Sequence, residues 1–402
     1  MKKIIGKYFA ILGLGLAALA GCSKGFAGVS DYASDKHSLA PGEAYEMADG
    51  AGGEVPGDGQ GAASGVVTAG EWNDIATWQF WGSLQNNKEW ASHASYWRFF
   101  PYNFVYLELS GSDGSPAVGL KAVLSKDGNK VWEAVSDNTG HAVLWAGLFE
   151  STYAVGEGYS LEIDGKDYPE FEFTTLGSTA AVANKFTVAS AKKDNAIDVA
   201  FIVDATGSMG DEIDFLKKDL EDIIKLVDEQ CTAKVRTGCL FYRDEGDEYI
   251  TRPSQFTTNL EDTKKFISKQ EAAGGGDWPE AVHTALSEGL QSLNWSSDAR
   301  SRVAFLVLDA PAHHEDAVIA SCQKSIEQYA KMGIKIVPVS ASGIDKACEY
   351  LLRSFALATN GTYVFITNDS GVGGDHIEAT VGEYQVEKLR DLIARLIIAY
   401  AK

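Results

Sequence analysis

The chain has 402 residues, in which 56 acidic side chains outnumber 35 basic ones and give a formal net charge of −21. This charge argues against nucleic acid as the main partner, because phosphate binding needs a basic surface. The 11% aromatic and 23% charged contents are those of a globular protein with sizeable cores, so they exclude a largely disordered or fibrous chain.

Residues 1–21 have the features of a secretory signal peptide. Three lysines precede an apolar run over residues 8–20, which is too short to span a membrane. The run leads into Leu-Ala-Gly-Cys ending at Cys22, which resembles the lipobox of bacterial lipoproteins. The resemblance implies that Cys22 carries the lipid that anchors the protein to the cell envelope. Ser23, in place of the Asp that marks inner-membrane retention, favours the outer membrane or cell surface of a Gram-negative bacterium. An ordinary signal peptide with an incidental cysteine is the alternative.

The next two segments differ in composition. Residues 22–70 are rich in glycine and acidic side chains and poor in large apolar groups, which predicts a flexible tether. Residues 71–98 contain five of the nine tryptophans, at spacings that suit one face of short helices. We interpret this Trp-rich segment as part of a core, with a sugar-binding platform as the alternative.

Residues 99–178 predict a small antiparallel β-sandwich. Short β-prone runs alternate with turns, and Asp127-Gly128 and Asp164-Gly165 supply the positive φ angles that tight hairpins need. The stretches at residues 114–119 and 137–142 resemble the carboxypeptidase-regulatory-like, immunoglobulin-like sandwiches of secreted bacterial proteins. No pair of catalytic groups stands out here, so we expect a spacer or presenting domain.

Strands and helices alternate over residues 195–402. An apolar run from Ile197 to Val203 predicts a buried parallel strand, and apolar residues at helical spacing follow over residues 211–229. Further strands are expected at residues 235–242, 303–308, 334–339 and 362–366. The alternation predicts an α/β fold with a doubly wound, mostly parallel, Rossmann-like sheet that binds ligands at the carboxyl ends of its strands.

Three loops at those strand ends carry oxygen ligands for a hard cation. The candidates are Asp204, Thr206 and Ser208 after the first strand, Asp277 in a glycine-rich loop, and Asp309 after a later strand. Carboxylate and hydroxyl oxygens suit Mg2+, with Mn2+ or Ca2+ as alternatives. The competing interpretation is a metal-free domain whose loops hydrogen-bond to one another.

Residues 195–402 resemble a von Willebrand factor type A domain. The Asp-x-Thr-x-Ser sequence at residues 204–208 matches the first loop of its metal-ion-dependent adhesion site, and Asp309 matches the third loop. The second loop, Gly-Gly-Gly-Asp-x-Pro-Glu at residues 274–280, resembles the hemicentin-like and α-kinase-associated subgroup. There Asp277 takes the place of the usual Thr, and a one-residue offset is the alternative.

The resemblance also implies how such a site works. Thr206 and Ser208 would contact Mg2+ directly, while Asp204 and Asp309 would act largely through bound water. The metal would then accept a carboxylate from a protein partner at its open coordination position. We therefore expect a lipid-anchored, non-enzymatic adhesion protein of the cell envelope. The alternative is a glycan-binding or glycan-processing protein that uses the Trp-rich segment and the sandwich, with the A domain as a scaffold.

The remaining cysteines and two neighbouring histidines suggest no separate site. Cys231, Cys239, Cys322 and Cys348 are interpreted mostly as small buried apolar residues, with a Cys231–Cys239 disulfide as the alternative. His313 and His314 follow Asp309 and could suggest zinc. Adjacent residues do not easily reach one ion, however, and no His-Glu-x-x-His motif is present, so a polar loop is favoured.

Overall fold

The computed structural model describes residues 67–152, 155–189, 193–368 and 376–402. The predicted signal peptide, Cys22 and most of the predicted tether lie outside the described residues. The described residues all belong to one compact unit, Gly59–Lys402.

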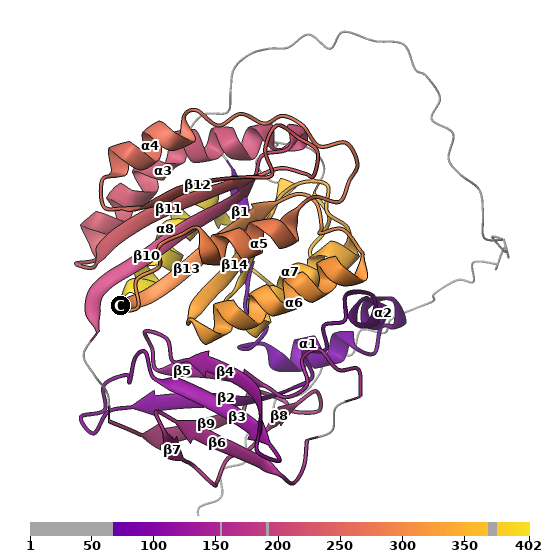
Figure 1. Cartoon of the computed structure of the whole chain (residues 1–402), viewed down its shortest axis with the longest axis vertical. Helices are drawn as coiled ribbons and strands as arrows, with labels where there is room; N and C mark the ends of the chain where they lie inside the picture. Colours follow the sequence, from indigo (N-terminus) through magenta and orange to yellow (C-terminus); the bar gives the residue numbers. More distant parts are fainter. Residues whose placement is uncertain (1–66, 153–154, 190–192, 369–375) are drawn as a thin grey trace, which may run out of the picture. The chain divides into compact units, whose positions relative to one another are not determined.

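An eight-stranded sheet in the order β12-β11-β10-β13-β14-β15-β1-β16 forms the centre of the α/β domain (Figure 1). Its parallel strands are β10 (Asp194–Asp204), β11 (Lys234–Tyr242), β13 (Ala299–Leu308), β14 (Ile334–Ser340) and β15 (Tyr363–Ile366). The predicted α/β fold with a mostly parallel sheet is therefore confirmed. The apolar runs noted in the sequence form these strands because both faces of the sheet are covered.

Helices cover the sheet on both sides. The helices are α3 (Gly210–Gln230), α4 (Leu260–Ile267), α5 (Val282–Gln291), α6 (Asp316–Lys331), α7 (Lys346–Ala358) and α8 (Leu389–Ala401). Apolar residues of α3, α4 and α8 pack with Val199 and Phe201 of β10, whereas those of α5, α6 and α7 pack with Ala200 and Ile202. Alternate residues of the central strand thus serve two separate cores.

Three antiparallel strands extend this sheet. They are β12 (Thr251–Thr257) beside β11, β1 (Thr68–Trp72) beside β15, and β16 (Glu387–Lys388) beside β1. The prediction of a tether through residue 70 is therefore wrong for residues 68–70. Gly70 allows this pairing, because a Cβ there would lie 2.5 Å from the ring of Phe365.

The Trp-rich segment folds into two short helices, α1 (Trp78–Leu84) and α2 (Lys88–Trp97). Its tryptophans are all buried, with exposures of 0–9%. Trp78 Nε1 donates to the Thr175 carbonyl at 2.7 Å, and Trp97 Nε1 donates to the Ala347 carbonyl at 2.7 Å. The segment therefore packs between the sandwich and the α/β domain, and its interpretation as core is confirmed.

The β-sandwich consists of two four-stranded sheets. One sheet contains β2 (Asn103–Ser110), β5 (His141–Trp145), β8 (Thr174–Thr175) and β9 (Ala183–Thr187). The other contains β3 (Lys121–Lys126), β4 (Asn129–Val135), β6 (Tyr159–Ile163) and β7 (Lys166–Asp167). The Asp-Gly pairs at residues 127–128 and 164–165 adopt positive φ angles, as the hairpin prediction requires. Strand β9 continues the fold beyond residue 178 and pairs with β2 in parallel.

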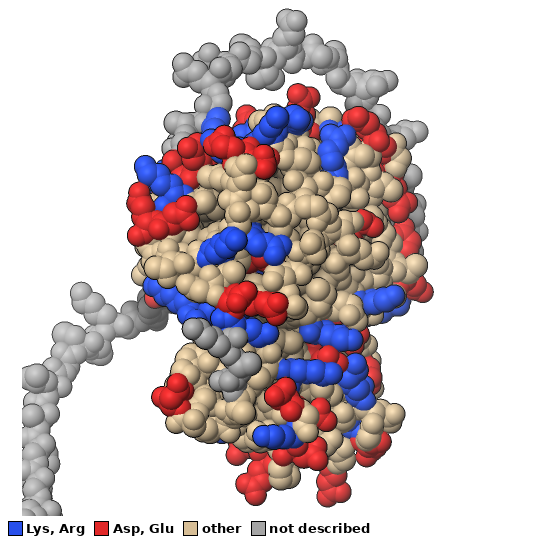
Figure 2. Space-filling model, turned by 60° about the vertical axis from the view of Figure 1, so that its left-hand side comes forward, with Lys and Arg blue, Asp and Glu red and all other residues tan. Residues whose placement is uncertain are grey.

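Polar contacts join the sandwich to the amino ends of the α/β strands. Asp137, in the β4–β5 turn, forms an ion pair with Lys335 at 2.8 Å and accepts a hydrogen bond from Asn360 at 3.0 Å. Burial alone would raise the pKa of Asp137, but Lys335 lowers it to about 2. Lysine and arginine side chains gather around this junction on the face shown in Figure 2. The carboxyl ends of the strands lie away from the contact with the sandwich.

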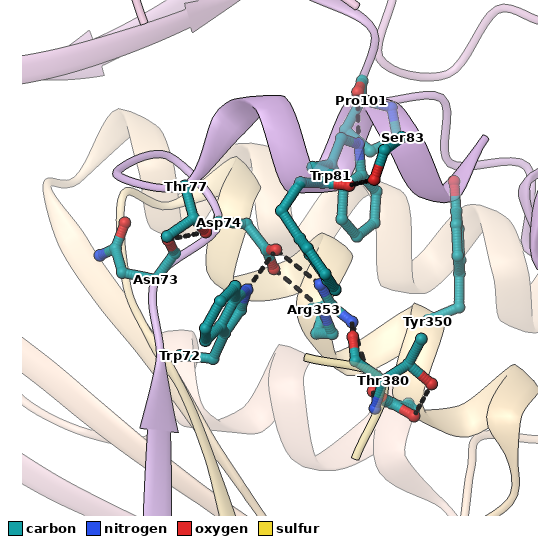
Figure 3. Close-up of polar contacts among 12 residues, drawn as sticks. Trp72, Asn73, Asp74, Thr77, Trp81, Ser83, Pro101, Tyr350, Arg353 and Thr380 are labelled. Carbon is teal, nitrogen blue, oxygen red and sulfur yellow. Dashed lines mark hydrogen bonds and ion pairs between the residues drawn. The ribbon is translucent and has the colours of Figure 1, made fainter. Parts of the chain in front are cut away.

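Arg353 of α7 ties the Trp-rich segment to the α/β domain (Figure 3). Its guanidinium is completely buried and forms a bidentate pair with Asp74, with distances of 2.6 and 2.9 Å. Glu349 lies 3.3 Å away on the same helix, and the rings of Trp81 and Trp90 lie about 5 Å from the guanidinium. The charge of Arg353 is therefore neutralised by groups from both parts of the chain.

Two further observations concern the cysteines and the membrane. Cys231, Cys239, Cys322 and Cys348 are all free thiols, so the alternative of a Cys231–Cys239 disulfide does not hold in this structure. Among the described residues, every helix is too short or too polar to cross a bilayer.

Asp74→Ala tests the role of the buried ion pair. The variant leaves Arg353 buried without its bidentate partner, so we expect it to lower the free energy of unfolding by about 3–5 kcal/mol. The matched control is Glu108→Ala, which removes the exposed pair with Lys185 and should cost about 1 kcal/mol or less. Urea denaturation followed by tryptophan fluorescence measures both, and equal losses in the two variants would contradict the role assigned to Asp74.

Candidate metal site

The first loop of the candidate site begins where β10 ends. Asp204 and Thr206 are 0% and 1% exposed, whereas Ser208 is exposed in the short 3-10 helix Gly207–Met209. One carboxylate oxygen of Asp204, Oδ1, accepts hydrogen bonds from the backbone N–H and the hydroxyl of Thr206, both at 2.8 Å. The loop thus holds its carboxylate and its first hydroxyl in a fixed relation.

The glycine-rich second loop is bonded directly to the first. Ala273 N donates to the Ala205 carbonyl at 3.0 Å, and Gly207 N donates to the Gly274 carbonyl at 3.1 Å. Gly275 has a φ of +74°, and a Cβ there would lie 3.2 Å from Cβ of Thr206. Glycine is therefore needed for the two loops to approach this closely.

The third loop completes the group. Asp309 follows β13, is 7% exposed and accepts a hydrogen bond from the Ser208 hydroxyl. The second and third loops are joined by a hydrogen bond from Glu280 N to the Pro311 carbonyl at 2.9 Å. The structure therefore brings together four of the predicted ligands, namely Asp204, Thr206, Ser208 and Asp309.

The fifth predicted ligand, Asp277, is not part of this buried group. Its side chain is exposed, whereas Glu280 of the same loop is 4% exposed and hydrogen-bonds to the Thr206 side chain. The bond to Pro311 and an isolated parallel bridge to Ala312 draw Glu280 inward. Glu280 thus replaces Asp277 as the second-loop carboxyl of the site.

The carboxyl groups of the site crowd one another in a region with little water. Burial and then the charge of Asp309 raise the pKa of Asp204 to about 7, although hydrogen bonds from Thr206 oppose the shift. Burial, followed by the charges of Asp204 and Asp244, raises the pKa of Glu280 to about 9. Glu212, at the start of α3, also has a pKa raised to about 7, by burial and then by Asp309. A cation at this position would relieve the repulsion.

The donor set fits a hard divalent cation. Asp204 Oδ2 and Glu280 Oε2 are buried and have no partner in good hydrogen-bond geometry, although the Tyr242 hydroxyl lies near enough to Asp204 to lower its pKa; buried acceptors normally have well-formed partners. In the described part of the chain, no three His, Cys, Asp or Glu side chains are placed to hold a metal by themselves. The hydroxyls of Thr206 and Ser208 would therefore have to complete the ligand set, as oxygen ligands suited to Mg2+.

Glu280 lay within the predicted second loop but was not assigned as a ligand, and Glu212 lies beyond the predicted first loop. Glu280 comes directly after Pro279, and Glu212 lies in the first turn of α3. A signal for Glu212 existed in the sequence, since an acidic residue on the apolar face of a predicted helix needs a partner. The second-loop motif includes Glu280, but it does not show which carboxyl turns inward, because the inward position depends on the third loop.

The two histidines have separate surroundings. His313 Nε2 lies 2.8 Å from Oδ1 of Asp244, and the His314 ring stacks on Tyr96 with centroids 3.6 Å apart. Burial alone would lower the pKa of His313, but the contact with Asp244 and the nearby Glu315 and Asp277 raise it. The two rings do not converge on one point, which agrees with the preference for a polar loop over a zinc site.

Residues 198–366 match the family model of the von Willebrand factor A domain, so such a domain is present in this chain. The chain is 34% identical over 119 residues to an ariadne-like RING finger protein of Acanthamoeba polyphaga mimivirus. It is 31% identical over 134 residues to an alpha-protein kinase of Dictyostelium discoideum. These matches cover 30% and 32% of this chain but only 11% and 21% of the two relatives.

Solved structures with von Willebrand A domains are also similar to the chain. A von Willebrand factor type A protein from Catenulispora acidiphila has 13% identity and a TM-score of 0.34, with 75% of this chain and 50% of that chain covered. Proximal thread matrix protein 1 of the mussel byssus, whose structure has a zinc-occupied MIDAS motif, has 15% identity and a TM-score of 0.36. That likeness covers 52% of this chain and 47% of the mussel protein.

Calorimetric titration with Mg2+ tests the site. The wild type should bind Mg2+, and a hundredfold excess of metal over its Kd should stabilise the fold by about 2.7 kcal/mol. Asp204→Ala and Ser208→Ala should lose both the binding heat and the rise in melting temperature. The control is Ser268→Ala, at the exposed end of α4, which should behave as the wild type does. Absence of binding by the wild type at millimolar Mg2+ would exclude a functional metal site.

Proposed function

We propose that this chain is a non-catalytic adhesion protein whose von Willebrand factor A domain binds a protein partner through a divalent metal. The observation that carries the proposal is the pair of unpartnered buried oxygens, on Asp204 and Glu280, at the carboxyl ends of the parallel strands. Ligands of open α/β sheets bind at this edge. Domains of this family commonly bind protein ligands, which is consistent with such a role.

The proposed ligand set divides into hydroxyls and carboxylates. Thr206 and Ser208 would hold the metal directly, while Asp204 and Asp309 would orient its bound waters and keep the two hydroxyls in place. Mg2+ is the proposed ion, with Mn2+ or Ca2+ as alternatives. When bound, the ion supplies an electrophilic position that accepts a carboxylate from the partner.

Glu280 is proposed to influence how strongly the metal attracts the partner's carboxylate at its open coordination position. Its carboxyl group lies close enough to the proposed ion for its negative charge to reduce the attraction of the metal for an incoming carboxylate. Its contact with Thr206 places it beside a proposed direct ligand.

The glycan-binding alternative loses the feature on which it depended. A sugar platform needs exposed aromatic faces, whereas Trp78 and Trp81 are 0% exposed and their Nε1 groups donate to backbone carbonyls. The remaining tryptophans of the Trp-rich segment are 9% exposed or less. This region therefore has a structural role in the described fold.

We also propose that the protein is anchored to the cell envelope by lipid on Cys22, at the outer membrane or cell surface of a Gram-negative bacterium. The support is the sequence of the leader, with its basic start, apolar run and Leu-Ala-Gly-Cys motif. Attachment through one lipidated residue would leave the A domain free to meet partners away from the bilayer.

A pull-down from an envelope or host extract tests metal-mediated adhesion. The immobilised full chain should capture a protein partner in Mg2+, and chelator should reduce capture at least about tenfold by removing the metal contact. Ser208→Ala should show the same loss with its fold intact, whereas Ser268→Ala should not. A partner retained equally in chelator and by Ser208→Ala would refute the mechanism without refuting the fold.

Cys22→Ala tests the anchor separately. Without the thiol no lipid can be attached, so we expect the variant to leave the membrane fraction or to accumulate as an unprocessed precursor. Cell fractionation with immunoblotting measures the distribution. A variant found quantitatively in the membrane fraction with a normally cleaved leader would contradict lipid anchoring.

A further inference from the structure

The metal site lies within a continuous surface, here called the metal face. It comprises the loops at residues 204–211, 243–250, 271–280 and 309–316, together with the end of α2. Gly275 N donates to Oδ2 of Asp247 at 2.9 Å, which joins the second and third of these segments. The His313–Asp244 contact joins the fourth, and the stack of His314 on Tyr96 brings in α2. The Trp-rich segment therefore contributes to the surface that a partner would meet.

The charge of the metal face is strongly one-sided. Its four loops contain no lysine, and their single arginine, Arg243, is buried beneath the first loop, where its Nε donates to the Ala205 carbonyl at 3.1 Å. Glu245, Asp277 and Glu315 are exposed on these loops. Within the described residues, none of the three forms an ion pair with lysine or arginine. They surround the site with negative charge that lysine and arginine do not neutralise, although His283 lies 3.9 Å from Glu245 and Arg98, at the end of α2, pairs with Asp316 of the fourth loop.

Exposed aromatic rings lie on the same face. Trp278, in the second loop, and Tyr96, at the end of α2, are each 45% exposed, and both are among the few large apolar side chains that reach solvent. Tyr96 is held in place by the stacking of its ring on His314 and by a contact of 2.8 Å between His314 Nε2 and the Tyr96 carbonyl oxygen. Aromatic faces and carboxylates share one preference, because both attract the cationic heads of lysine and arginine.

The centre of the metal face places a second and independent requirement on the partner. The unpartnered oxygens of Asp204 and Glu280 point to a bound cation, and a cation there would need a carboxylate to complete its coordination. An acidic or neutral partner would have to bring that carboxylate past Glu245, Asp277 and Glu315. A partner carrying positive charge beside its carboxylate would meet attraction from both the metal and the surrounding face.

We infer that the partner presents its metal-binding carboxylate within a stretch rich in lysine or arginine, and that Glu245, Asp277, Glu315 and Trp278 select that stretch. This inference rests on the proposed metal-mediated adhesion and identifies the class of partner. The metal binds the carboxylate, and the acidic and aromatic side chains of the metal face attract the positive charge next to it.

Short synthetic peptides test the inference with the full chain. Each peptide has one central Glu, flanked by Lys, by Ser or by Asp, and a fourth has a central Gln flanked by Lys. In Mg2+ at low salt, the Lys-flanked Glu peptide should bind about tenfold more tightly than the Ser-flanked peptide, and the Asp-flanked peptide should bind least. The preference should shrink at high salt, because exposed charges are screened.

A triple variant and a matched control locate the preference. Glu245→Gln, Asp277→Asn and Glu315→Gln together should remove most of the preference for Lys while keeping Mg2+-dependent binding of the Ser-flanked peptide. The control neutralises three exposed acids of the sandwich, Glu162→Gln, Asp167→Asn and Glu170→Gln, with the same change in net charge. Trp278→Ala alone should weaken binding of the Lys-flanked peptide by about threefold.

The outcomes separate this inference from the proposed function. Equal binding of the Lys- and Ser-flanked peptides, a preference that survives in the triple variant or disappears in the control, or no binding of the Lys-flanked peptide at millimolar concentration would overturn the inference. Chelator and the Gln peptide test the metal contact alone. A preference for Lys that persists in chelator and with central Gln would refute metal-mediated binding and still support the cationic selectivity of the face.

Discussion

The buried guanidinium of Arg353 is the constraint from which the organisation of this protein follows. A charge without access to water must be paired, and the carboxylate that pairs with both of its nitrogens comes from Asp74, 279 residues earlier in the chain. Detachment of the Trp-rich segment would remove the bidentate partner of Arg353 and the tryptophan rings beside its guanidinium. The same attachment places β1 in the central sheet and brings Tyr96 beside the third loop of the metal site. The Trp-rich segment is therefore part of the domain it precedes.

The protein contains two buried groups of charges, and their states differ. Around Arg353, two positive groups, Arg353 and Lys346, pair with Asp74 and Glu349, and the guanidinium has acceptors, as expected of a structural connection. At the strand ends, Asp204, Glu280 and Asp309 are all acidic groups with raised pKa values, and no lysine or arginine pairs with them among the described residues. The first arrangement is complete within the described chain, whereas the carboxyl groups of the second repel one another, a repulsion that protonation or a cation would relieve. This contrast is the physical basis for assigning structure to one group and function to the other.

Opposite ends of the central sheet serve different purposes. The sandwich contacts the amino ends of the strands through Asp137, Lys335 and Asn360, in a junction where opposite charges meet. The carboxyl ends present loops that are negative, aromatic and free of contact with the sandwich. A partner at the metal face and the sandwich at the other end would therefore not compete for the same surface.

The sequence alone determined the features that depend on local pattern. Continuous apolar runs and helical spacing specified the parallel strands and their helices, the Asp-Gly pairs specified the hairpins, and Asp204, Thr206, Ser208 and Asp309 fell at the ends of their strands. Tertiary structure decided what depends on contacts between distant segments. Strand β1 forms because it pairs with β15, where Gly70 lies against the ring of Phe365, although residues 68–70 have the composition of a tether. Glu280 rather than Asp277 faces Thr206 because the hydrogen bond from Glu280 N to the Pro311 carbonyl turns the second loop. The residue spacing within the second loop does not reveal this hydrogen bond to the third loop.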